Sequence, residues 1–516
     1  MYMKSDKIII VGGGSAGWMS AATLIHFFPN KDITVVESPD HPISGVGEST
    51  LAGIRPWMLA LGLNEQEFMK YCDASYKQSI KFVDFYKQND GGFHNPLGHP
   101  TYEKKFLGLN DWQLKKHYYP DTPRQDYCRT FYSMMPCVEN NKLYIGNQLE
   151  NYKFERDTAY HFDGVKFGLY LRDHYCIPRG VKHIQATISS IDVGEDGIER
   201  LFLNDERFLF ADLYIDCTGS KAILLNKLEE PFISYNDIIP NNRAWATKIP
   251  YKNKKEELEP YTTCTALGHG WVWNIPLWSR IGTGYVYDDT SISPEQALED
   301  FKQYLGDRSD VEYKDIKMRV GIHERTWVKN VVGIGMAAGF IEPLQSSGLY
   351  TVHEFLLKLI RALNRDEYNQ WDRDVYNTST RNMFDRFAHF VAFHYTLSLR
   401  TDTEYWKNIH NKTFDEKMVL QQPTISSQFF DLMRRQTQVE DHPPVGVHCI
   451  CAGMDYRMID PVIVFEWNWN FPDIDMKKMI DNFIVLNSSM RSRWQKIADN
   501  SPTVYDYLKE HIYGND

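Results

Sequence analysis

The residues whose types and spacing most clearly predict chemistry form a glycine-rich run near the N-terminus, Gly12-Gly-Gly-Ser-Ala-Gly17. The run directly follows the apolar segment 7–11, and Glu37 stands at the end of a second apolar segment, 20 residues beyond Gly17. Such a run between a strand and a helix, with an acidic residue about 20 positions further on, is typical of a dinucleotide site. We therefore predict that a dinucleotide binds here and that Glu37 accepts hydrogen bonds from its adenosine ribose.

Each small residue of this run has a physical task in such a site. Gly12 permits a tight turn, Gly14 lets the backbone approach the pyrophosphate, and Gly17 lets the helix and the strand pack closely. The helix N-terminus, which includes Ser15 and Ala16, offers free N–H groups and the positive end of a dipole to the phosphates. The alternative interpretation is a glycine turn with a structural role alone.

These residues can act only if a β-turn-α-β unit positions them. The sequence predicts a strand over 7–11, a helix to about Phe28 and a strand over 32–37. Alternating apolar residues between 183 and 210 predict a meander of antiparallel strands, and 212–219 is typical of a buried strand. The fold class is therefore α/β.

The rest of the chain divides by composition. Residues 85–150 are rich in Tyr, Asn, Gly and Pro, which predicts a loop-rich insertion within a core that spans 1–348. Beyond it, apolar residues recur at helical spacing from Leu349 to Leu363. We expect residues 349–516 to form a mostly helical, substrate-side region.

Composition excludes several classes of function. The chain has 516 residues, and 57 basic against 68 acidic residues give a net charge of −11, which argues against a nucleic-acid partner. Its eight cysteines show no C-x-x-C pairing, and Cys449 and Cys451 match no zinc spacing, so we expect free thiols and no metal. Without a signal-peptide core or an apolar run of roughly 20 residues, we expect a cytoplasmic protein without a membrane partner.

The dinucleotide is predicted to be FAD. The late strand at 212–219 and the insertion before it resemble the Rossmann-like, FAD-binding fold of the aromatic hydroxylases. The segment Gly333-Ile-Gly-Met-Ala-Ala-Gly339 resembles the second flavin-contacting loop of that group. Since no second G-x-G-x-x-G lies between a strand and a helix, we expect reducing equivalents to come from a separate flavin reductase.

Five further strings point to one family. Trp271-Val-Trp-Asn-Ile-Pro276 resembles the W-x-W-x-I-P signature of the flavin-dependent tryptophan halogenases, and Gly45-Val-Gly-Glu-Ser-Thr50 resembles their V-G-E-[AS]-T flavin loop. The neighbourhood of Lys77, the string Tyr160-His-Phe-Asp163 and the loop Phe340-Ile-Glu-Pro-Leu-Gln-Ser-Ser-Gly348 are similar to other segments of the family. The resemblance covers residues 5–365 in order.

The resemblance implies a mechanism. Reduced FAD (FADH2) reacts with O2 to a flavin hydroperoxide, which oxidises a halide ion to hypohalous acid. Lys77 donates a hydrogen bond to that acid or forms a haloamine with it, beside an aromatic substrate. The implied residues are Ser347 and Gly348 for halide, Trp271, Trp273, Ile275 and Pro276 for shielding the flavin, and Gly12, Gly14, Ser15, Ala16, Gly17, Glu37, Gly47, Glu48, Ser49, Thr50, Gly335, Ala338 and Gly339 for FAD.

One position departs from the family pattern. Gln345 stands where better-known members carry a glutamate, and an amide can neither act as a base nor carry charge. Gln345 is therefore a candidate catalytic position with weaker assistance to the substrate. We hypothesise that bromide or iodide is a better halide than chloride, and that the substrate is an electron-rich ring such as a phenol or an indole.

Two other functions are compatible with the sequence. An FAD-dependent aromatic monooxygenase would hydroxylate its substrate without halide, and a catalytically silent flavoprotein would bind FAD without turnover. The strings Phe93-His-Asn-Pro96 and Trp467-Asn-Trp469 are candidates for aromatic walls of a substrate site. The sequence is also compatible with a homo-oligomer.

Overall fold

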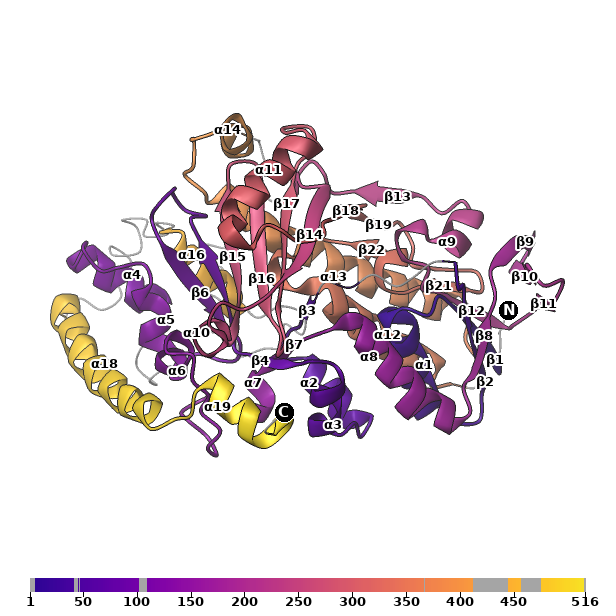
Figure 1. Cartoon of the computed structure of the whole chain (residues 1–516), viewed down its shortest axis with the longest axis horizontal. Coiled ribbons are helices and arrows are strands. Elements are labelled where there is room, and N and C mark those ends of the chain that lie inside the picture. The colour runs from indigo at the N-terminus through magenta and orange to yellow at the C-terminus, as the bar shows by residue number, and fades with distance from the viewer. Residues whose placement is uncertain are drawn as a thin grey trace. The chain divides into compact units, whose positions relative to one another are not determined.

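The computed structural model describes residues 5–40, 45, 47–101, 109–365, 367–411, 444–455 and 475–514 (Figure 1). The chain forms two compact units, each built from three segments. Unit 1 comprises Met1–Ser75, Tyr160–Pro250 and Leu277–Ala388, and unit 2 comprises Tyr76–Ala159, Tyr251–Pro276 and His389–Asp516.

Unit 1 is built on a mainly parallel sheet. Its strand order is β20 (Trp327–Val328), β21 (Val331–Gly333), β12 (Leu213–Asp216), β1 (Lys7–Val11), β2 (Asp32–Glu37) and β8 (Lys182–Gln185). In β1, Ile8 lies opposite Leu213 on one side and Ile33 on the other, and all three are buried. The apolar runs therefore form central strands because both faces are covered, and the predicted strands 7–11 and 32–37 are confirmed.

Helices and a meander complete this part of unit 1. Helix α1 (Ser15–Phe27) follows β1, as the glycine run predicts. From residue 188 on, the predicted meander is confirmed as β9 (Ile188–Gly194), β10 (Gly197–Leu203) and β11 (Phe208–Leu209), which pair antiparallel. Its predicted start at residue 183 is wrong, because β8 pairs parallel with β2 and belongs to the main sheet. It contributes Leu201 and Leu203 to a core that also contains Ile9 and Tyr214.

Unit 1 contains further strands and helices besides this sheet. Strand β14 (Arg243–Ile249) pairs antiparallel with β17 (Ile281–Tyr287) and with β18 (Lys314–Lys317). The others are β3 (Glu48–Ser49), α2 (Ile54–Ala60), α3 (Glu65–Tyr71), α8 (Gly164–Tyr170), α9 (Ile223–Lys227), β13 (Phe232–Ser234), α11 (Pro294–Leu305), β19 (Gly321–His323), β22 (Gly339–Phe340) and α12 (Ser347–Leu363). The unit boundary passes through β4 (Ser75–Lys77), β7 (Ala159–Phe162) and α13 (Gln370–Thr396).

Unit 2 contains strands that pair side by side. Strand β15 (Tyr261–Leu267) pairs antiparallel with β16 (Gly270–Pro276) and parallel with β5 (Ser79–Val83), which pairs antiparallel with β6 (Gly92–Pro96). Its helices are α4 (Leu109–Tyr118), α5 (Asp126–Phe131), α6 (Met135–Glu139), α7 (Phe154–Asp157), α10 (Lys254–Glu257), α14 (Glu404–Asn411), α16 (Pro444–Gly453), α18 (Met476–Asp499) and α19 (Val504–Leu508).

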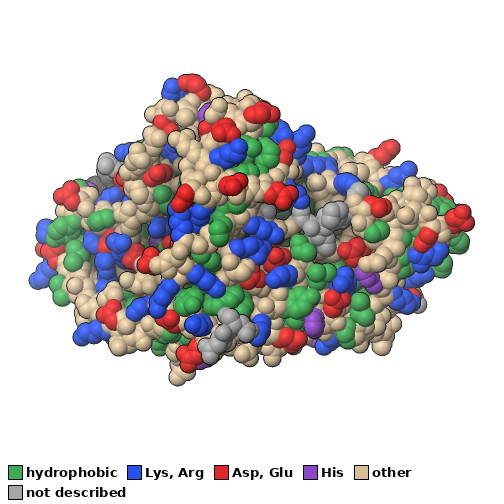
Figure 2. Space-filling model, viewed as in Figure 1, with side chains coloured by type: hydrophobic (Ala, Val, Ile, Leu, Met, Phe, Trp, Pro, Cys, Tyr) green, Lys and Arg blue, Asp and Glu red, His purple; other side chains and the backbone are tan. Residues whose placement is uncertain are grey.

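Beyond residue 348 the named secondary-structure elements among the described residues are all helices, as the prediction of a mostly helical region requires. The division of the chain at residue 348 stays a prediction. Among the described residues, no helix is long and apolar enough to cross a membrane, and no cluster of three or more His, Cys, Asp or Glu could hold a metal. Figure 2 shows basic and acidic side chains interspersed over the face drawn.

Candidate active site

The glycine turn between β1 and α1 requires glycine at two positions for packing. Gly12 has φ +114°, and a Cβ there would overlap the carbonyl oxygen of Cys217. A Cβ on Gly17 would overlap the carbonyl oxygen of Gly12. A Cβ on Gly14 would meet nothing within 4 Å, so the backbone at Gly14 borders open space where a ligand can approach.

The start of α1 offers an anion site. Gly14 is the N-cap and supplies no capping side chain, and the first turn carries no acidic residue. The Ser15 hydroxyl donates a hydrogen bond of 2.7 Å to the Gly164 carbonyl and does not cap the helix either. The first backbone N–H groups of a 13-residue helix are thereby left to a negatively charged ligand.

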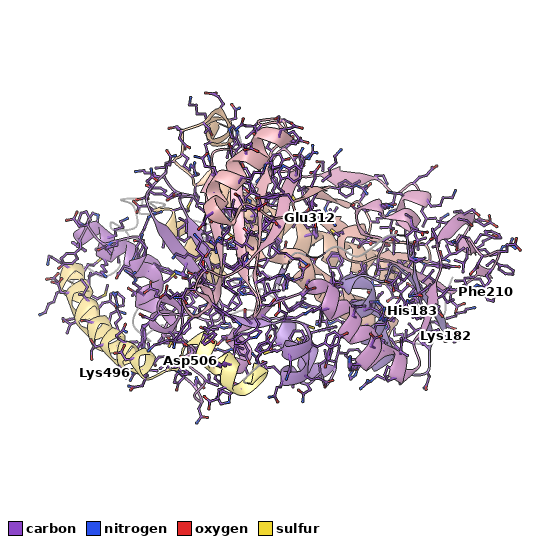
Figure 3. The ribbon with its side chains drawn as sticks, viewed as in Figure 1. Lys182, His183, Phe210, Glu312, Lys496 and Asp506 are labelled. Atoms are coloured by element: carbon purple, nitrogen blue, oxygen red, sulfur yellow. The ribbon has the colours of Figure 1, made fainter. Side chains whose placement is uncertain are left out.

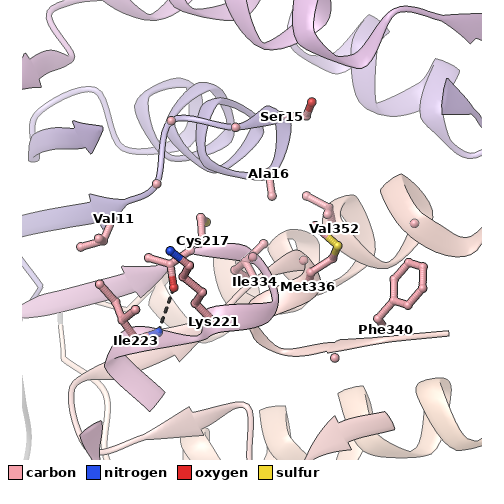
Figure 4. Close-up of a pocket in the computed structure, with 18 of the residues that line it drawn as sticks. Val11, Ser15, Ala16, Cys217, Lys221, Ile223, Ile334, Met336, Phe340 and Val352 are labelled. Carbon is pink, nitrogen blue, oxygen red and sulfur yellow. Dashed lines mark hydrogen bonds between the residues drawn. The ribbon is translucent and has the colours of Figure 1, made fainter. Parts of the chain in front are cut away.

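A cavity of about 510 Å³ in unit 1 brings most of the predicted cofactor residues together (Figure 4). The ends of β1, β2 and β12, the 3-10 helix Gly335–Ala337 and the start of α12 line it. The predicted residues in its wall are Gly12, Gly14, Ser15, Ala16, Glu37, Glu48, Gly335, Gly339, Ser347 and Gly348. Its size, its glycine cradle and the open start of α1 fit a dinucleotide such as FAD.

The other predicted cofactor residues lie outside this wall: Gly17, Gly47, Ser49, Thr50 and Ala338. Thr50 is buried, and its hydroxyl donates a 2.8 Å hydrogen bond to the Tyr160 carbonyl. The Ala338 N–H donates to the Gly335 carbonyl at 3.0 Å. These contacts fix the backbone behind the cavity.

Glu37 lies at the cavity wall with a partner that the sequence analysis did not identify. Its Oε2 is 2.8 Å from Nε2 of His183, a β8 residue labelled in Figure 3. The ring of Trp18 lies edge-on to the imidazole of His183, with 5.1 Å between centroids. His183 therefore orients the carboxylate of Glu37. The alternating apolar residues that begin at position 183 were the only sequence pattern that indicated a strand at His183.

Asp216, at the end of β12, is a second residue that the sequence analysis missed. Its buried carboxylate accepts hydrogen bonds from the N–H groups of Thr218, Leu224 and Leu225 and from the Thr218 hydroxyl, at 2.6–3.1 Å. Burial raises its pKa despite these bonds. Asp216 fixes the turn that carries Thr218 and Gly219 into the cavity wall. The sequence pattern that could have identified it is an acidic residue at the end of a predicted buried strand.

The loop before α12 places backbone N–H groups at the cavity. Ser346 is in the left-handed region, with φ 59° and ψ 38°, and its Oγ lies 3.0 Å from Oγ of Ser49. This turn aims the N-terminus of α12 so that Ser347 and Gly348 line the cavity. The first turn of α12 contains no acidic residue, and a Cβ on Gly348 would meet nothing within 4 Å.

Gln345 is buried at the end of the 3-10 helix Pro343–Gln345. Three residues earlier, the buried carboxylate of Glu342 accepts a 2.8 Å hydrogen bond from Asn241. Glu342 is thus engaged within the core of unit 1 and does not replace the carboxylate that is missing at Gln345.

Lys77 ends β4, and its side chain is fully buried. Burial lowers the pKa of Lys77 from the ordinary value of 10.5 to about 7. The electrostatic interaction with Cys264 acts in the opposite direction and raises this pKa. A lysine in this environment changes its protonation state near neutral pH, whereas a surface lysine stays protonated there.

The predicted shielding residues lie on β16. Trp271 is fully buried, and its ring lies 6.2 Å from the ring of Trp273 at 60°. Trp273 pairs with Cys264 across the β15–β16 ladder. Cys264 is the residue whose electrostatic interaction raises the pKa of Lys77. Ile275 and Pro276, at the end of the strand, are also buried. Lys77 and the two tryptophans thus belong to one unit, and Cys264 lies near both Lys77 and Trp273.

The predicted aromatic wall at 93–96 is occupied by packing in unit 2. Phe93 stacks on Phe82 with 5.3 Å between ring centroids, and a Cβ on Gly453 would overlap the Phe93 ring. His94 Nδ1 lies 3.1 Å from the Ser79 hydroxyl. The string Trp467-Asn-Trp469 lies outside the described residues.

A parallel α/β sheet with this glycine turn and cavity defines a Rossmann-like, dinucleotide-binding fold. The family model described as tryptophan halogenase matches residues 7–438. The 7-chloro-L-tryptophan 6-halogenase KtzR of Kutzneria sp. (strain 744) is 32% identical over 473 residues, covering 86% of this chain and 90% of that protein.

Solved structures agree with this match. The apo structure of VirX1 has 35% identity and a TM-score of 0.89 over 99% of this chain and 100% of that chain. Tar14, a tryptophan C-6 flavin-dependent halogenase (chlorinase) from taromycin biosynthesis, has 30% identity and a TM-score of 0.84 over 97% and 99%. The chain belongs to the tryptophan halogenase family and is an FADH2-dependent halogenase with the family's FAD-binding fold.

Proposed function

We propose that this halogenase transfers a bromine or iodine atom to an electron-rich aromatic ring and that Lys77 activates the halogen. The observation that carries this proposal is the buried lysine whose pKa is lowered to about 7. Such a group is present as both amine and ammonium at neutral pH. It can therefore bond to halogen as an amine or donate a hydrogen bond as an ammonium.

The cavity of unit 1 holds the flavin in this proposal. Gly12 and Gly14 and the start of α1 bind the pyrophosphate, and Glu37, oriented by His183, binds the ribose. When bound in reduced form, FAD supplies the electrons that, with O2, oxidise halide to hypohalous acid. Because the sequence has no second G-x-G-x-x-G between a strand and a helix, we propose that a separate reductase delivers the reduced flavin.

The start of α12 is the proposed halide site. The N–H groups of Ser347 and Gly348 point from a helix N-terminus whose first turn lacks acidic side chains. Backbone N–H groups and the helix dipole favour an anion there. Ser347 would bind halide through its backbone N–H group, which any residue could supply. A side chain at position 348 would instead project into the open space in front of the helix start.

Trp271 and Trp273 are the proposed barrier between flavin and organic substrate. Two rigid indoles on one strand, one of them fully buried, form a wall that does not collapse when the substrate site is empty. Such a wall favours halogenation over direct hydroxylation.

The halide and substrate preferences follow from Gln345. A buried amide gives no negative charge to a cationic ring intermediate and takes no proton from it. We therefore propose that easily oxidised halides and electron-rich phenols or indoles react faster than chloride and unactivated rings. Free tryptophan is a second candidate, because KtzR and Tar14 are named for halogenating tryptophan or its 7-chloro derivative.

Incubation with FAD, NADH, a flavin reductase, O2 and each halide in turn tests the proposal against a panel of aromatic substrates. Mass spectrometry should detect brominated or iodinated products, and Lys77→Ala should abolish them while FAD still binds. Lys81→Ala is the matched control, since Lys81 lies on the neighbouring strand β5 and faces Tyr261. Hydroxylated product without halide would support a monooxygenase, and FAD binding without any product would support a silent flavoprotein.

A further inference from the structure

Glu48 presents a carboxyl group to the flavin cavity. It lies on β3, opposite Phe162 of β7, and its side chain forms part of the cavity wall. The backbone of Gly164 packs against it so closely that a Cβ there would lie 2.7 Å from Cγ of Glu48. Among the described residues, none hydrogen-bonds to this carboxyl group. It is therefore held in place by packing and left available to a molecule in the cavity.

The charges around Glu48 are arranged to keep it neutral. Asp163, which caps α8, lies behind it, and Arg280 binds Asp163 at 2.7 Å and Asp73 at 2.8 Å. The first turns of α1 and α12 bring no charged side chain, and Lys166 on α8 is exposed. Glu37 and Lys221 are the other charged residues in the described wall of the cavity.

Burial, and secondly the Asp163 carboxylate, raise the pKa of Glu48 from 4.5 to about 7. Arg280 is bound to two other carboxylates, and no cation in the described part of the chain offsets these two effects on the pKa of Glu48. At neutral pH about half of such carboxyl groups carry a proton, so Glu48 can both hold a proton and release it.

The chemistry of a halogenase consumes a proton at the flavin. Formation of hypohalous acid balances as FADH2 + O2 + X⁻ + H⁺ → FAD + HOX + H2O. The halide loses two electrons, FADH2 loses two, and O2 gains four while its O–O bond breaks. The proton converts one oxygen into a neutral leaving group, and a cavity walled by protein needs a donor for it.

We propose that Glu48 is the proton donor of the flavin cavity: as a neutral acid it hydrogen-bonds to bound flavin, and it supplies the proton that halide oxidation consumes. This assignment rests on the proposed location of FAD in the cavity of unit 1. Solvent reprotonates Glu48 between turnovers, because the side chain is partly exposed.

The affinity for oxidised FAD tests the first half of the proposal without turnover. If the neutral acid binds flavin, the Kd should rise about tenfold between pH 6 and pH 8 as Glu48 ionises. Glu48→Gln, which keeps a donor of the same shape, should give a Kd that differs little between these pH values. Glu195→Gln removes an exposed carboxyl group and should retain the wild-type slope. A wild-type Kd that stays constant or falls with rising pH would overturn the assignment.

The fate of O2 tests the second half. With reduced FAD, O2 and bromide, Glu48→Gln should consume O2 but release it as H2O2 (FADH2 + O2 → FAD + H2O2), with at least a tenfold loss of brominated product per O2. Glu48→Asp, which keeps an acid, should recover part of the coupling. If the wild-type enzyme brominates and Glu48→Gln couples equally well, Glu48 is not the donor. If the wild-type enzyme forms no product with any halide, the proposed function itself fails.

Discussion

The buried position of Lys77 leads to a prediction that needs neither flavin nor substrate. The side chain is fully buried, and burial lowers its pKa to about 7. Relative to the ordinary value of 10.5, this corresponds to ~5 kcal/mol in favour of the neutral amine. At pH 7 about half of the molecules then carry a neutral Lys77, against roughly 1 in 3,000 for an unperturbed lysine.

Lysine labelled with ¹³C at Cε allows this titration to be measured by NMR. We expect one Cε signal to titrate with a midpoint near pH 7, and we expect that signal to be missing from Lys77→Met and from Lys77→Arg. Cys264→Ala should lower the midpoint further, because Cys264 opposes the effect of burial. The reasoning fails if the signal that both substitutions remove titrates above pH 9.

The same variants separate the two roles of Lys77. An arginine stays protonated and can donate a hydrogen bond, but it cannot bond to halogen as an amine. If the amine route operates, Lys77→Arg should lower the initial rate of bromination at least 10²-fold, as Lys77→Met should. An activity of Lys77→Arg within tenfold of wild type would instead establish the hydrogen-bond route.

Three further perturbations have defined outcomes. Initial rates should be higher with bromide and iodide than with chloride, and Gln345→Glu should raise the chloride rate relative to bromide; a faster chloride reaction in the wild type would contradict the halide preference. Gly14→Ala should leave the thermal unfolding midpoint nearly unchanged and raise the Kd for FAD at least tenfold, whereas Gly17→Ala should lower the midpoint, because only Gly17 meets backbone. Arg280→Ala leaves two buried carboxylates without a cation and should destabilise unit 1 by ~3–5 kcal/mol, measured by denaturant unfolding; a loss below 1 kcal/mol would show that the network is dispensable.

Local patterns made the nucleotide-binding part of the fold predictable. Residues 7–11 and 32–37 are short apolar runs that flank a glycine turn, and both are strands in the structure. The alternation from residue 188 on predicted the meander for the same reason, since period-two burial is visible within a few residues, but it could not show that residues 182–185 pair with β2 instead. The glycines at positions 12 and 17 were also interpretable from the spacing of the motif, although the close neighbour of Gly12 is the distant Cys217.

Features that depend on distant segments could not be obtained in this way. The burial of Lys77 and the contribution of Cys264 join residues almost 190 positions apart, and no local pattern encodes them. Likewise, His183 meets Glu37 only because β8 pairs with β2, and Glu48 faces Asp163 only because β3 pairs with β7. The family resemblance pointed to Lys77, but its electrostatics required the fold.

The division of the chain into interleaved segments has a consequence for biosynthesis. Unit 1 ends at Ala388, and unit 2 contains segments from both before and after that point. At about 5–20 residues per second, a ribosome needs roughly 20–80 s before the last segment of unit 1 has been made. Neither unit can therefore fold to completion early in translation, and no contiguous truncation yields one unit without segments of the other. Expression of this enzyme should accordingly respond to slow translation and to chaperones more strongly than expression of a protein whose domains follow one another along the chain.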